Sequence, residues 1–214
     1  MSRPGDTLGS VRRGAFGLVF AALFPACDSG TAPAPANVTY EAGPPTGPCD
    51  AVEQQHAIEG QTHVPECSVV HYGTKPPSSG DHYGVWAAFK IYSNPIPEGY
   101  FVHDLEHGAI VFSYNCPSGC DADVSAASAT LAALPPDPLC LTEGTARRRD
   151  VMTPDPHLDV PFAASAWGFT LRAKCFDPEV FRSFAERHYG QGPEALCADG
   201  VDLSGGVSPG CGGP

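Results

Sequence analysis

The chain has 214 residues, of which 42% are hydrophobic and 17% charged, so it carries enough apolar side chains for one packed domain of ordinary size. Glycine (24) and proline (23) make up more than a fifth of the residues, which favours a loop-rich body over a helical bundle. The formal net charge of −12 excludes non-specific binding to nucleic acid, because such binding needs a basic surface that neutralises phosphates.

Residues 1–26 have the pattern of a lipoprotein-type signal peptide. Three arginines precede a short apolar run over 14–24, and Cys27 follows a small residue, as in a bacterial lipobox. The run is too short to span a ~30 Å hydrocarbon core as a helix, and no later stretch is long enough either. We therefore expect export to the bacterial cell envelope, with lipidation at Cys27 as the contact with the membrane. Plain secretion, with Cys27 as a spare thiol, is the alternative.

The composition then divides the remainder of the chain into three parts. Residues 27–49 are rich in proline and alanine and are expected to form a tether, because they cannot bury enough apolar surface to offset the entropy of ordering. Residues 50–200 are expected to form a single globular domain, and residues 201–214 a glycine-rich tail.

Within the domain, apolar runs bounded by glycine and proline predict both strands and helices. The predicted strands cover 87–92, 109–114, 147–153 and 162–175. The predicted helices cover 97–107, 124–134 and 177–189. Because the two kinds of element alternate only loosely, we predict an α+β fold, with a small antiparallel or mixed sheet and a few helices on one side.

Eight cysteines follow Cys27, an even number that predicts up to four disulfides in an exported protein. Pro-Ser-Gly separates Cys116 from Cys120 and favours a tight turn, so a local bridge is expected there. The pairing of the other six stays open. Thiolate metal ligation is the alternative, but no second closely spaced cysteine pair accompanies this one.

The main candidate site is the string His103-Asp104-Leu105-Glu106-His107. On a helix, histidines at i and i+4 lie one turn apart, so the imidazoles of His103 and His107 can reach one ion. Glu106 would bind the ion, orient a histidine, or handle protons as a catalytic base. The string also matches an inverted zinc-peptidase signature, but Gly108 ends the helix too early for that enzyme.

Further histidines precede this string. His82 follows a Pro-Pro-Ser-Ser-Gly loop, which is a suitable way to present a third imidazole to a pair on a helix. His63 is a weaker candidate ligand. Five of the eight histidines fall between residues 63 and 107. Imidazole with carboxylate suits a divalent transition metal, Zn²⁺ or Cu²⁺, better than Ca²⁺ or Mg²⁺.

Several strings occur together in an order that resembles the bacterial domain of unknown function 3105 family. They are Thr-His-Val (62–64), the stretch from Tyr72 to His82, Val-His-Asp-Leu-Glu-His-Gly (102–108) and Ala-Trp-Gly (166–168). The cysteines are additional to this pattern. The resemblance implies an exported or membrane-tethered domain whose histidines and glutamate gather in one place, and it implies no reaction.

Three functions are compatible with these features. The first is an exported protein that binds a transition metal through His82, His103 and His107, with Glu106 as ligand or neighbour. The second is a metal-assisted hydrolase at the same site, which requires an open coordination position. The third is a non-catalytic, disulfide-rich envelope binding protein whose histidines only form hydrogen bonds in a polar core, and histidines scattered through the structure would favour it. The sequence identifies no small-molecule or protein partner.

Overall fold

The computed structural model describes residues 41–144, 146–206 and 211. The predicted signal peptide, Cys27 and the first part of the predicted tether lie outside the described residues, as does most of the tail after 206. Among the residues described, no helix combines the length and the apolar character needed to cross a bilayer.

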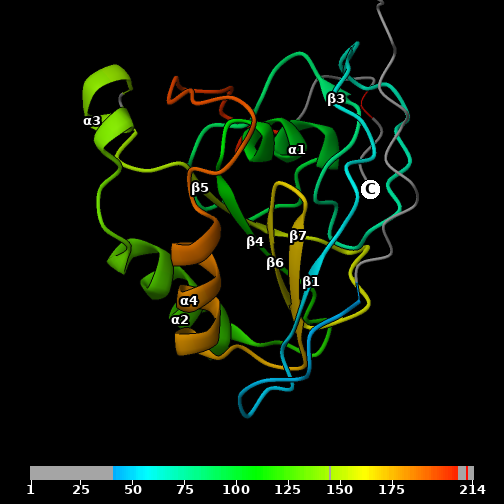
Figure 1. Cartoon of the computed structure of the whole chain (residues 1–214), viewed down its shortest axis with the longest axis vertical. Coiled ribbons are helices and arrows are strands. Elements are labelled where there is room, and N and C mark those ends of the chain that lie inside the picture. Colours follow the sequence, from blue (N-terminus) through cyan, green and yellow to red (C-terminus); the bar gives the residue numbers. More distant parts are fainter. Residues whose placement is uncertain (1–40, 145, 207–210, 212–214) are drawn as a thin grey trace, which may run out of the picture. The chain divides into compact units, whose positions relative to one another are not determined.

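The centre of the domain is a mixed five-stranded sheet with the strand order β1-β7-β6-β4-β5 (Figure 1). Only the pair β4–β5 is parallel, and the other three neighbouring pairs are antiparallel. The strands are β1 (Val52–Gln55), β4 (Ile110–Tyr114), β5 (Asp150–Pro154), β6 (Phe162–Ala166) and β7 (Phe169–Ala173). A separate parallel pair consists of β2 (His63–Val64) and β3 (His82–Tyr83). The α+β prediction is therefore confirmed.

Four helices accompany the sheets within the described residues: α1 (Glu98–Glu106), α2 (Asp121–Ala133), α3 (Pro138–Glu143) and α4 (Pro178–His188). Helix α4 begins where the sequence indicated. The Asp177 carboxylate accepts hydrogen bonds from the first turn, and Pro178 occupies the first helical position, where its missing N–H removes no helical bond. Asp137 caps α3 in the same way through the N–H of Leu139.

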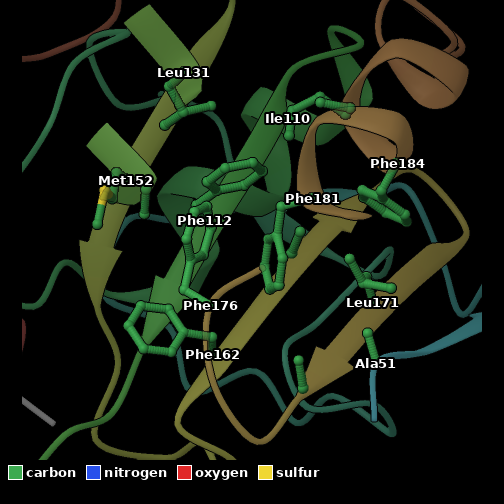
Figure 2. Close-up of a cluster of buried hydrophobic side chains, with 14 of the residues drawn as sticks. Ala51, Ile110, Phe112, Leu131, Met152, Phe162, Leu171, Phe176, Phe181 and Phe184 are labelled. Atoms are coloured by element: carbon green, nitrogen blue, oxygen red, sulfur yellow. The ribbon is translucent and has the colours of Figure 1, made fainter. Parts of the chain in front are cut away.

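Alternate residues of the central strands point into two separate cores, one on each face of the sheet. On one face, Phe112 of β4 packs with Phe181 of α4 and Leu131 of α2 (Figure 2). On the other face, Val111 packs with the apolar side of α1, including Leu105. The predicted placement of all helices on one side is therefore wrong, because β4 is buried on both faces and each face needs a cover.

Several element boundaries also differ from the sequence prediction. Residues 87–92 form only isolated bridges rather than a strand. The predicted long strand 162–175 is a hairpin, because Gly168 takes a φ of +76° and the chain turns there between β6 and β7. The pattern did not predict β1, α3 or the small β2–β3 sheet.

The eight described cysteines form four disulfides, which confirms the prediction from their even number. They pair Cys49 with Cys175, Cys67 with Cys211, Cys116 with Cys120, and Cys140 with Cys197. Three of these bridges join segments separated by 57 to 144 residues, and one of them ties Cys140 of α3 to the loop at Cys197. Such a set indicates an oxidising, extracytoplasmic environment.

Candidate metal site

The small parallel sheet brings two histidines that are far apart in the sequence next to each other. In the register of β2 and β3, His63 is paired with His82, so the two side chains project from the same face. The N–H of His82 donates to the carbonyl of Thr62 at 3.1 Å, which fixes this register. The two imidazole centroids are 4.9 Å apart.

The buried loop before β3 orients the ring of His82. Pro76 to Gly80 are buried, and the carbonyl of Gly80 lies 2.8 Å from Nδ1 of His82. A carbonyl only accepts hydrogen bonds, so Nδ1 is the donor and Nε2 is the ring nitrogen that faces the rest of the site. Nε2 of His82 lies 2.9 Å from Oε2 of Glu106.

Helix α1 supplies the other two groups, His103 and Glu106, which lie three residues apart and therefore on one face of the helix. Nδ1 of His103 lies 2.7 Å from the carbonyl of Tyr83, so this ring presents Nε2 as a lone pair. Gly99, one turn before His103, allows α1 to approach β3, since a Cβ there would lie 2.8 Å from the ring of Tyr83.

One potential ligand atom from each of His63, His82, His103 and Glu106 lies within 4.8 Å of all the others. Tetrahedral coordination at ~2.0–2.1 Å places donor atoms about 3.3 Å apart. The distances from Glu106 Oε2 to His82 Nε2 (2.9 Å) and to His63 Nε2 (3.5 Å) lie on either side of that value. The four side chains therefore fit one metal ion with little rearrangement.

Burial differs sharply among the four candidate ligands. His82, His103 and Glu106 are almost completely buried, whereas the side chain of His63 is 50% exposed. Trp86 covers His103, and Trp167 approaches the ring of His82 edge-on. The group is therefore open to solvent on the side of His63.

His107 lies beside this group rather than in it. Its ring is 4.5 Å from that of His103, but it packs against Trp86, and its Nε2 lies 3.4 Å from a carboxylate oxygen of Glu194. The helical pair that contributes to the group is thus His103 with Glu106 at i+3, instead of His103 with His107 at i+4. His63, the weaker candidate, is brought in by a strand pairing that hydrophobic alternation did not reveal.

The surroundings keep the imidazoles of His103 and His107 neutral. Burial lowers the pKa of His103 to about 4, even though its hydrogen bond to Tyr83 acts in the opposite direction. Burial, followed by the charge of His103, lowers the pKa of His107 to about 3. Neutral imidazole is the form that binds a metal ion, so His103 needs no deprotonation at neutral pH.

The chain matches the family described as Protein of unknown function (DUF3105) over residues 63–199, which is more than half of its length. The chain belongs to this family. Comparison with curated proteins and with solved structures finds no match. The matched segment of this DUF3105 protein begins at His63 and contains all four residues of the candidate site. The family match confirms the resemblance inferred from the sequence strings and assigns no activity.

Proposed function

We propose that this domain binds one divalent transition-metal ion, Zn²⁺ or Cu²⁺, through His63, His82, His103 and Glu106. The observation that carries the proposal is the 2.9 Å approach of His82 Nε2 to Glu106 Oε2. Because Nδ1 of His82 donates to the carbonyl of Gly80, Nε2 is the ring nitrogen that faces the carboxylate of Glu106. Either a proton on Nε2 or a metal ion between the two atoms accounts for this close approach.

The hydrogen bonds around the ligands support a metal ion over a proton. Histidines that bind metals usually donate their second ring nitrogen to a carbonyl or carboxylate, which fixes the tautomer and the ring orientation. His82 and His103 both have such a bond, to Gly80 and Tyr83 respectively. The acidic chain would also attract cations from solution.

The donor set favours binding or storage of the metal over metal-assisted hydrolysis. A hydrolytic zinc site generally has three protein ligands and keeps the fourth position for water. Here Glu106 supplies a fourth donor close to the three imidazoles, which would close a tetrahedral shell. The convergence of the imidazoles also argues against the third function, which scattered histidines would favour.

We further propose that the protein is exported and held at the bacterial cell envelope by lipidation of Cys27. The disulfides are consistent with the oxidising compartment that this location implies. Detergent phase partitioning of the protein made in a bacterial host tests the anchor. The wild-type protein is expected in the detergent phase and Cys27→Ser in the aqueous phase, and an aqueous wild-type protein would contradict lipidation.

Metal binding is tested with untagged protein, stripped with a chelator and titrated separately with Zn²⁺ and Cu²⁺ by calorimetry. We expect one ion per chain and a rise in the melting temperature, because an ion that binds only the folded state stabilises it. His82→Gln and Glu106→Gln should each weaken binding by at least about tenfold. The matched control is His71→Ala, which removes an exposed histidine outside the group. No bound metal and no thermal shift in the wild-type protein would refute the proposal.

A further inference from the structure

A cavity of about 410 Å³ lies at the N-terminal end of α1, and none of the four candidate metal ligands lines it. Its volume is in the range of small-molecule sites. Tyr72, Tyr83, Val70 and Ile96 contribute aromatic and apolar surface to its wall, and Glu98 and Asp155 contribute carboxyl groups. We call this cavity the α1 pocket.

Neither carboxyl group of the α1 pocket has an ion-pair partner among the described residues, and the charge of Lys75 acts on both without pairing with them. Asp155 is 4% exposed, and its Oδ2 has no hydrogen-bond partner among the described residues. Its Oδ1 accepts the N–H of His157 at 2.9 Å. In the part of the chain that the structure covers, no lysine, arginine or histidine nitrogen forms an ion pair with Glu98 or Asp155.

The unpaired negative charges make ionisation of Glu98 less favourable. Burial, together with the neighbouring negative charge of Asp155, raises the pKa of Glu98 to about 7, although Lys75 acts in the opposite direction. Burial also raises the pKa of Asp155. A positive group placed in the α1 pocket would therefore stabilise the ionised form of both acids.

The lining of the pocket favours an organic cation over a metal ion. Glu98, Asp155 and His157 all line it, yet their ligand atoms do not converge as those of the metal-site group do. The wall instead offers tyrosine rings and aliphatic side chains. Aromatic faces attract organic ammonium groups, and apolar walls bury a hydrocarbon body.

We propose that the α1 pocket binds a small organic amine, with its ammonium group near Glu98 and Asp155 and its apolar body against Tyr72 and Tyr83. This site is independent of the proposed metal ion. Tyr83 lines the pocket, and its carbonyl oxygen lies 2.7 Å from Nδ1 of His103 in the metal site.

The test is calorimetric titration of the metal-free full-length protein with 2-phenylethylamine, compared with 2-phenylethanol and phenylacetate. We expect saturable one-to-one binding of the amine at millimolar or lower concentration, and at least tenfold weaker binding of the neutral and anionic analogues. Glu98→Gln should weaken amine binding by about tenfold. The matched control, Glu143→Gln at an exposed position of α3, should leave it unchanged.

Two further variants distinguish binding in the α1 pocket from binding elsewhere on the protein. Val69→Trp adds bulk at an exposed position of the wall, so it should block the amine without changing a charge or the fold. Glu106→Gln removes the carboxylate of the metal site and does not line the pocket, so it should bind the amine normally, whereas an amine that binds through the metal site would lose affinity. The proposal is overturned if the amine does not bind, if the alcohol binds equally well, or if neither Glu98→Gln nor Val69→Trp weakens binding.

Discussion

Nε of Arg149 lies 2.7 Å from Oδ2 of Asp137, and both side chains are almost completely buried. The hydroxyl of Tyr189 donates to the same carboxylate oxygen at 2.8 Å. Through Nη1, Arg149 also donates to the carbonyl of His107, directly after the last residue of α1. This network connects α3, the start of β5 and the end of α4 to the helix that carries two of the candidate ligands.

Asp137→Asn is expected to destabilise the fold strongly. The substitution leaves Arg149 buried without a counter-charge, and breaking one side of a buried pair typically costs about 3–5 kcal/mol. Denaturant unfolding at pH 7 measures the loss. The control is Asp50→Asn, which breaks the exposed pair with Lys174 and should change the stability far less. Equal effects of the two substitutions would contradict a role for the buried network.

The same pair should make stability depend on pH in the acid range. Burial alone would raise the pKa of Asp137, but hydrogen bonds from Tyr189 and Arg149 outweigh it and lower the pKa below its ordinary value. The stabilisation is therefore present above about pH 4 and is lost as the pH falls through the lowered pKa. The stability difference between the wild-type protein and Asp137→Asn should shrink over that range.

His107→Ala is expected to retain metal binding, whereas His103→Ala should lose it. Both residues lie at the end of α1, but only His103 belongs to the group whose ligand atoms converge. Metal titration of the two variants under the same conditions distinguishes them. Circular dichroism serves as the control, because a variant that loses metal binding must still be folded for the loss to be assigned to the missing ligand. If His107→Ala loses the ion as completely as His103→Ala, then His107 is a ligand, as the sequence indicated.

Gly99→Ala should destabilise the protein, although alanine is the better helix former by about 1 kcal/mol. The added Cβ would lie 2.8 Å from three atoms of the Tyr83 ring, so α1 and β3 would have to move apart. Overpacking of this kind typically costs about 1–3 kcal/mol. The melting temperature and the affinity for the metal ion should both decrease. Gly205→Ala is the control, because its Cβ would meet no atom within 4 Å.

Glu98→Gln should make the protein less sensitive to pH between 5 and 8. The pKa of Glu98 is raised from 4.5 to about 7, chiefly by burial. Between these values the folded state holds a proton that the unfolded state has released, so stability falls as the pH rises. We expect the free energy of unfolding of the wild-type protein to fall by roughly 1–3 kcal/mol more than that of the variant between pH 5 and pH 8. Parallel pH profiles for the two proteins would contradict this prediction.

Local sequence signals determined much of the scaffold and part of the site. The aspartate cap and proline before α4, the apolar run of β4 and the glycine after α1 each act through neighbouring residues, so they were predictable. His103 and Glu106 are three residues apart, and helix geometry alone places them on one face. The even number of cysteines predicted up to four bridges, because parity does not depend on the fold.

Tertiary structure decided what depends on contacts between distant segments. The pairing of six cysteines, the cover of the sheet on both faces and the turn at Gly168 all needed the folded chain. Two-residue strands carry too little alternation to be recognised, so the pairing of His63 with His82 was not predictable. His107 contacts Trp86 and the carboxylate of Glu194, which come from loops before and after α1, so its place beside the group was decided by the folded chain.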